Sequence, residues 1–175
     1  MCPVGDTSQD FNNRGFWPLY AIVAVNYTTP LTASNGAIVT PHYSYAALLR
    51  PPNVVTIGAQ GEYAPQKIAW IKKASRARTS SMSARTGAFL VAKTGVLDGL
   101  SATAHHDSYD QFEKQFAAVR LVRGPRYVEN GKIATAGGLT LRVELALHLV
   151  ERYFGKASAH TTALYGVQTL IPAGG

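Results

Sequence analysis

The chain has 175 residues, of which 46% are hydrophobic and 15% are charged, and its formal net charge is +7. These proportions are typical of one folded domain with its own core, and they exclude a disordered chain. No apolar run reaches the roughly 20 residues of a membrane-spanning helix, and the first residues lack the basic and apolar regions of a secretory signal. Cys2 is the only cysteine, so an intrachain disulfide and a cysteine-based metal site are excluded. We therefore expect a cytoplasmic protein with no membrane contact.

Positive charge is densest on one predicted helix, at Lys72, Lys73, Arg76 and Arg78. A solvated helix face explains this run, because the interleaved aromatic residues of single-strand binders are absent there. We therefore expect no nucleic-acid partner, although the charge still favours an acidic small molecule or partner.

The first third of the chain predicts strands and turns. Leu19–Val25 is a continuous apolar run of β-forming residues, which predicts a buried strand. Thr32–Thr40 contains an Asn-Gly dipeptide between β-prone flanks, which predicts a hairpin. Asn53–Gly58 predicts a second buried strand, and a glycine-containing loop leads from it into a helix over Pro65–Ala77.

One short stretch then predicts a sharp turn from a strand into a helix. Thr79–Met82 is small and β-tolerant, whereas Gly87–Lys93 is an apolar helical run that should stop at Gly95. Only Ser83–Thr86 lies between them, which is too short for a loop of its own. Such an elbow holds one side chain above the end of a sheet, near the positive end of the helix. Here that side chain is Arg85.

After the elbow, the pattern predicts two strands around one helix. The strands are Leu100–Ala104 and Val119–Val122. Between them, Ser108 and Gln111 resemble a capping box that opens a helix ending near Phe116.

The last third predicts a hairpin and then two helices. Tyr127–Ala134 should turn at Asn130-Gly131, Leu141–Val150 has the broad apolar face of a strong helix, and a last helix spans Ala157–Tyr165. Strands that alternate with helices indicate an α/β fold with a mainly parallel sheet.

Three segments of the second half follow a known pattern: Arg85–His105, Arg126–Gly138 and Glu144–Val150. The first contains Arg-Thr-Gly-Ala, Gly-Val-Leu-Asp-Gly and Ala-Thr-Ala-His. These segments resemble the ThiJ/PfpI superfamily, which has the class I glutamine amidotransferase-like fold. The resemblance is strongest to isocyanide hydratases and to the amidotransferase-like domains of some AraC-type regulators. There the pattern runs Cys-Thr-Gly-Ala/Ser, Gly-Leu-Leu-Asp-Gly and Ala-Thr-Thr-His.

The resemblance implies a flavodoxin-like three-layer α/β sandwich over residues 19–175, after a loose or divergent segment at residues 1–18. It also implies a homodimer. The family's first strand and helix have no counterpart before Leu19, so the first β-α unit is missing or divergent. The family's glycine-rich loop is only partly kept, as Gly58-Ala59-Gln60-Gly61. The family's cysteine nucleophile falls on Arg85.

An arginine at this position excludes covalent cysteine catalysis there. Its guanidinium stays protonated and offers only hydrogen-bond donors. Ser83 and Thr86 flank it, but each is a poor nucleophile without an activating base, so hydrogen bonding in the turn is the simpler role. Cys2 could replace the nucleophile only if the amino terminus folded over the site.

Arg85 can instead hold an anion, because its planar fork at a helix start matches a carboxylate or phosphate. We expect a pocket there for a small acidic or polar metabolite. The alternative is an internal ion pair with Glu62 or Glu144, which would plug a dead active site. The predicted pocket lining is Gly58, Gln60, Gly61, Arg85, Thr86 and His105.

His105 stands where many family members place a histidine close to the cysteine. It is the candidate for acid/base catalysis or for a hydrogen bond to a ligand. His106 and Asp107 follow it, but adjacent strand residues point to opposite faces, so we expect no metal site and no cofactor. His148 lies within an apolar helical run and is expected in the core or at an interface.

Three hypotheses about function stay open at this point. The chain is a binder of a small metabolite, acting as a sensor or pseudoenzyme. Or it is a hydratase, lyase or cyclase in which His105 transfers a proton while Arg85 stabilises an anion. Or it is a dimerisation or regulatory module.

Overall fold

The structure is a computed structural model, and it describes residues 23–24, 30–32, 36–41, 43–44, 52–59, 63–76, 80–138 and 141–165. The chain divides into two compact units, Met1–Arg50 and Pro51–Gly175, and we describe each by itself. Several expectations lie outside the described residues: the segment at 1–18, most of the Leu19–Val25 strand, Cys2, Gln60, Gly61 and Glu62. Among the described residues, no helix combines the length and the apolar character that crossing a membrane requires.

The first unit contains two pairs of short strands. β1 (Val23–Ala24) pairs parallel with β4 (Tyr43–Ser44). β2 (Leu31–Thr32) pairs antiparallel with β3 (Ile38–Val39). Gly36 between β2 and β3 has a φ of 82°, a left-handed conformation that glycine adopts without strain. The hairpin predicted from the Asn-Gly dipeptide is confirmed.

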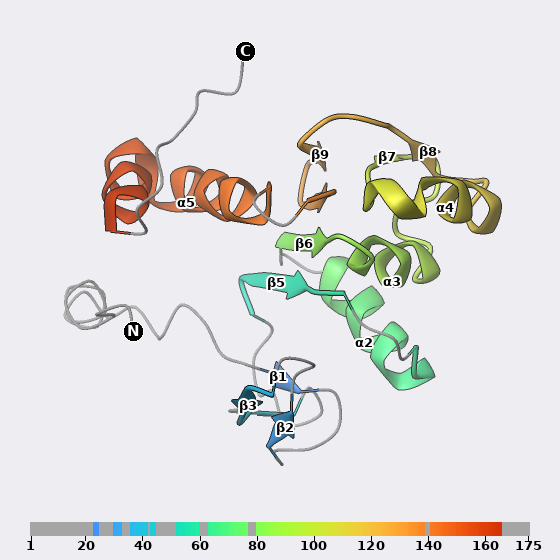
Figure 1. The fold of residues 1–175 in the computed structure, drawn as a ribbon, viewed down its shortest axis with the longest axis horizontal. Helices are drawn as coiled ribbons and strands as arrows, with labels where there is room; N and C mark the ends of the chain where they lie inside the picture. The colour runs from blue at the N-terminus through green and yellow to red at the C-terminus, as the bar shows by residue number, and fades with distance from the viewer. Residues whose placement is uncertain are drawn as a thin grey trace. The chain divides into compact units, whose positions relative to one another are not determined.

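The second unit is built on a four-stranded sheet in the order β5-β6-β10-β9 (Figure 1). β5 (Val54–Ile57), β6 (Ser80–Ala84) and β10 (Ile133–Ala136) run parallel. β9 (Tyr127–Asn130) pairs antiparallel with β10, as the predicted Asn-Gly hairpin requires. The prediction of a mainly parallel sheet is therefore confirmed.

Two further strands, β7 (Ser101–Ala102) and β8 (Arg120–Leu121), pair parallel with each other. Both are shorter than predicted. Because β7 ends at Ala102, the chain leaves strand geometry before it reaches the two histidines.

β5 corrects one prediction, since it is not buried along its length. Only Ile57 is buried, whereas Thr56 is exposed and the two valines are half-buried. β5 ends the described strand order and has β6 as its one described neighbour. An apolar run predicts a strand reliably, but it does not tell a central strand from an outer one.

Side chains alternate across β6 and separate two hydrophobic clusters. On one face, the Ser81 hydroxyl lies 2.9 Å from that of Ser75 in α2 (Pro65–Arg76). This face carries α2 and α3 (Gly87–Lys93) with the larger cluster, which includes Ile71, Phe89, Leu90 and Phe112. Burying a side chain of this size stabilises the fold by roughly 1.5–3 kcal/mol.

On the other face of β6, Met82 packs with Leu145 and Leu149 of α5 (Leu141–Tyr165). Figure 1 shows α5 across β6 from α2 and α3. The unit is thus a helix–sheet–helix sandwich, as predicted. α5 is interrupted at Gly155, whose φ of 85° and ψ of 166° are not helical. The two predicted helices therefore exist and meet at this break.

α4 (Tyr109–Gln115) is preceded by a 3₁₀ turn, η2 (His106–Ser108). The predicted capping box is wrong. Ser108 precedes α4, but its side chain makes no capping hydrogen bond. Its backbone belongs to the 3₁₀ turn, with φ −112° and ψ 5°, rather than to the extended conformation that a capping residue usually adopts.

Candidate ligand-binding site at the strand–helix elbow

The predicted elbow is present, and Arg85 is at its centre. β6 ends at Ala84 and α3 begins at Gly87. Arg85 has a φ of 54°, and no other non-glycine residue in the described part of the chain has a positive φ. Its N–H donates to the carbonyl of Ala136 at the end of β10, at 2.9 Å. A non-glycine residue in this conformation costs roughly 1–2 kcal/mol, and such strain gathers at functional sites.

Two glycines let the surrounding chain ends approach the elbow. A Cβ at Gly87 would lie 2.3 Å from the carbonyl oxygen of Ile57 and 2.9 Å from that of Gly58. A Cβ at Gly137 would lie 2.7 Å from the carbonyl oxygen of Ala104. The end of β5 therefore packs directly on the elbow, and the segment that precedes His105 packs on the end of β10.

Arg85 and His105 contact each other, as the predicted site requires. Nη2 of Arg85 lies 3.3 Å from Nε2 of His105. Arginine has donors only, so Nε2 must accept, and the His105 proton is on Nδ1. Nδ1 lies 3.5 Å from Oδ2 of Asp107. The His105 side chain is 14% exposed, so its orientation is fixed by these neighbours.

The guanidinium of Arg85 is not fully satisfied. Its Nε is buried and has no hydrogen-bond partner among the described residues. Glu144, one of the two predicted ion-pair partners, pairs instead with Arg126 at 3.1 Å. Within the described residues, then, no carboxylate neutralises Arg85, and the Glu144 form of the plugged-site hypothesis is wrong.

The other predicted lining residues divide into two groups. Gly58 lies at the elbow through its contact with Gly87, and Thr86 is the half-buried residue before α3. The Thr86 hydroxyl makes no capping hydrogen bond to the start of α3. Gln60 and Gly61 lie outside the described residues.

Beneath the elbow lies a group of buried hydroxyls, of which the sequence singled out only Ser83, wrongly, as a hydrogen-bonding residue of the turn. Ser83 and Thr135 are register partners on β6 and β10, and the Thr103 N–H donates to the Thr135 hydroxyl at 2.8 Å. All three residues are fully buried. The hydroxyls of Ser83 and Thr103 have no partner among the described residues. Small polar residues at three strand ends were the available signal, but only the register shows that they meet.

The sequence predicted that His105 and His106 point to opposite faces of a strand, and this prediction is wrong. His105 precedes the 3₁₀ turn and His106 begins it, so strand alternation does not apply. The ring centroids lie 4.3 Å apart. Nε2 of His106 lies 2.9 Å from Oδ1 of Asp107, which brings all three side chains together.

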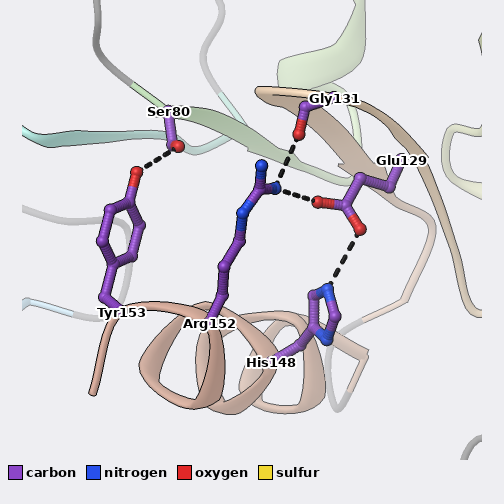
Figure 2. A network of polar contacts seen from close by, with 6 residues as sticks. All are labelled: Ser80, Glu129, Gly131, His148, Arg152 and Tyr153. Carbon is purple, nitrogen blue, oxygen red and sulfur yellow. Dashed lines mark hydrogen bonds and ion pairs between the residues drawn. The ribbon is translucent and has the colours of Figure 1, made fainter. Parts of the chain in front are cut away.

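A second polar cluster joins α5 to the β9–β10 hairpin (Figure 2). The Glu129 carboxylate accepts from Nη1 of Arg152 at 2.5 Å and lies 3.0 Å from Nε2 of His148. Arg152 also donates to the carbonyl of Gly131 at 2.7 Å. These residues line an open hollow of about 440 Å³. His148 is half-buried. The Glu129 carboxylate already pairs with both Arg152 and His148. The cluster therefore attaches α5 to the hairpin and offers no unpaired charge to a ligand.

Comparisons with known proteins address the fold. No protein-family model matches the chain. Over 91 residues it is 28% identical to the HTH-type transcriptional regulator CdhR of Pseudomonas aeruginosa, a segment that covers 52% of this chain and 27% of that regulator. The similarity thus involves about a quarter of the regulator's length.

Solved structures match over nearly the whole chain. A Vibrio parahaemolyticus protein described as a transcriptional regulator is 24% identical with a TM-score of 0.77, covering 91% of this chain and 86% of that one. An AraC family transcriptional regulator from Pseudomonas putida is 16% identical with a TM-score of 0.73, covering 90% and 85%. A ThiJ/PfpI family protein from Pseudomonas syringae is 22% identical with a TM-score of 0.71, covering 89% and 66%.

At these identities the matches establish architecture and not activity. They agree with the overall α/β architecture described above. The chain has a flavodoxin-like α/β fold, which it shares with solved structures of a ThiJ/PfpI family protein, a DJ-1 superfamily protein and an AraC family transcriptional regulator.

Proposed function

We propose that this domain binds a small acidic or polar metabolite at the elbow, through Arg85 and His105, and that it acts as a sensor without covalent chemistry. Arg85 takes the place of the cysteine in the ThiJ/PfpI pattern. The observation that carries the proposal is the state of Arg85: a strained backbone holds a cation whose Nε is buried and unpartnered among the described residues. A carboxylate or phosphate supplies the acceptors that this guanidinium lacks.

The neighbouring groups favour binding over catalysis. The Nε2 lone pair of His105 is occupied by a donor from Arg85, so His105 has no free base at the elbow. Ser83 is fully buried, so its hydroxyl is kept from any substrate. A hydratase or lyase would need at least one of these groups to be free and aligned.

The similarity to proteins named as transcriptional regulators supports a sensing role. A sensor needs a specific site but no turnover, which agrees with a position where arginine replaces a nucleophile. The homodimer and the cytoplasmic location expected from the sequence stay part of this proposal.

A thermal-shift screen tests the proposal with small carboxylates, inorganic phosphate and an alkyl isocyanide as probes. A ligand at 100 times its Kd stabilises the native state by about 2.7 kcal/mol, which raises Tm by the order of 10 °C. We expect such a shift with at least one anion. It should vanish in Arg85→Met, which removes the cation, and shrink in Arg85→Lys, which keeps the charge but cannot form the bidentate fork.

Equal shifts in the wild type and Arg85→Met would contradict the proposal, as would the absence of any anion shift. Turnover of the isocyanide that disappears in His105→Gln would instead establish the enzymatic alternative.

A further inference from the structure

We propose that His105, His106 and Asp107 form a binding site for a divalent transition-metal ion of the Zn²⁺ class. Each of the three residues offers one ligand atom, and these atoms all lie within 4.8 Å of one another. The proposal departs from the expectation of no metal site, because that expectation assumed strand geometry for residues that begin a 3₁₀ turn.

The distances suit a small ion with imidazole and carboxylate ligands. Zn–N and Zn–O bonds are about 2.0–2.2 Å, so two ligands at a tetrahedral angle lie roughly 3.4 Å apart. The Asp107 carboxylate oxygens lie 3.5 Å from Nδ1 of His105 and 2.9 Å from Nε2 of His106. The three ligand atoms lie within 4.8 Å of one another, so the exposed side chains of His106 and Asp107 would have to close in on His105 to surround one ion.

The ligand types select the class of metal. Two imidazoles and one carboxylate suit Zn²⁺ and related transition ions, whereas Mg²⁺ prefers oxygen ligands alone. Three protein ligands also leave one tetrahedral position open for water or another small ligand.

The site is accessible, and one of its members is fixed. The side chains of His106 and Asp107 are 74% and 73% exposed, whereas that of His105 is 14% exposed. The Ser108 N–H donates to the His105 carbonyl at 2.9 Å, which closes the turn that carries all three residues. An ion can therefore reach two exposed ligands and one that the fold already orients.

Metal binding would also change what His105 presents to Arg85. Without metal, Nε2 accepts from Arg85 and Nδ1 carries the proton. Metal coordination at Nδ1 requires the proton to move to Nε2, which then becomes a donor facing another donor. Arg85 is released from His105 by this change. The bond from Arg85 therefore opposes metal binding, and neither the metal site nor this opposition requires the anion site to exist.

Zinc titration of the full chain by isothermal calorimetry tests both the metal site and its link to Arg85, with Mg²⁺ as a comparison ion. We expect one Zn²⁺ per chain and no measurable Mg²⁺ binding. His106→Gln should weaken Zn²⁺ binding at least about tenfold, because it removes a ligand itself rather than a supporting group. It leaves the Arg85–His105 contact untouched. His160→Gln, which changes an exposed histidine on α5, is the matched control and should bind as the wild type does.

Arg85→Met provides the second arm. Loss of the opposing hydrogen bond should tighten Zn²⁺ binding by roughly fivefold. Unchanged or weaker binding in Arg85→Met would overturn the link to Arg85. The metal site itself would be overturned by equal binding in His106→Gln and wild type, by loss of binding in His160→Gln, or by the absence of saturable binding at one ion per chain.

Discussion

Arg85 combines two features that seldom occur together, a positive φ and a buried, unpartnered guanidinium nitrogen. Glycine adopts a φ of 54° freely, whereas any L side chain there is strained. A residue whose backbone is unfavourable and whose side chain lacks a carboxylate partner among the described residues contributes little to folding. This combination supports the proposal that Arg85 serves a ligand rather than the stability of the fold.

Strain at Arg85 predicts the order of stability of two variants. Arg85→Gly and Arg85→Ala both remove the guanidinium, but only glycine relieves the backbone. We expect Arg85→Gly to be more stable than Arg85→Ala by about 1 kcal/mol, measured by urea denaturation. The reverse order would show that the left-handed conformation at this position is not maintained in solution.

Tyr127 gives a pH-dependent prediction. Burial, and then the nearby Glu129 carboxylate, raise the pKa of Tyr127 above its ordinary value of 10.0. The folded state therefore keeps the phenol proton when the unfolded state has lost it. The free energy of unfolding should receive this contribution in full below about pH 10 and lose it as the pH rises further. Denaturation between pH 8 and pH 11 measures the fall, which should be shallower in Tyr127→Phe.

Among the elements, the end of β5 packs closely against the start of α3 at the elbow. Gly87 allows it, because any Cβ there would overlap backbone atoms that have no room to move. We expect Gly87→Ala to destabilise the protein by about 3 kcal/mol, at the upper end of the cost of overpacking.

Gly58→Ala is the matched control for this prediction. Gly58 lies on the other side of the same contact, but a Cβ there would meet nothing within 4 Å. Its effect should stay within about 0.5 kcal/mol. Similar losses in both variants, compared by chemical denaturation, would mean that general loss of glycine flexibility and not the close approach is responsible.

The elements that the sequence predicted well are those with a strong local signal. The Asn-Gly hairpins, the apolar helices and the strand–helix elbow depend on neighbouring residues, and all are present. The prediction of a capping box was wrong because Ser108 lies in the 3₁₀ turn that precedes α4. The prediction that His105 and His106 point to opposite faces was wrong because β7 ends at Ala102. The periodicity of the sequence does not mark that boundary.

Two features of the molecule could not be predicted from the sequence because each depends on contacts between distant segments. The meeting of Ser83, Thr103 and Thr135 depends on the register of parallel strands, which no local pattern encodes. The Glu129 cluster likewise joins a hairpin to a helix that follows it (Figure 2). The resemblance stated from the sequence pointed to the elbow and predicted the correct fold, but it could not supply a role for Arg85.

Anion binding by Arg85 can be followed through the ¹⁵N–¹H resonance of its Nε–H group, during titration with the anion that gives the largest thermal shift. Its absence from the Arg85→Lys spectrum assigns it. We expect a saturable shift of this resonance, since a bound carboxylate or phosphate supplies the acceptor that Nε lacks among the described residues. Titration to saturation that moves other resonances and leaves this one unchanged would contradict the claim that Arg85 holds the ligand.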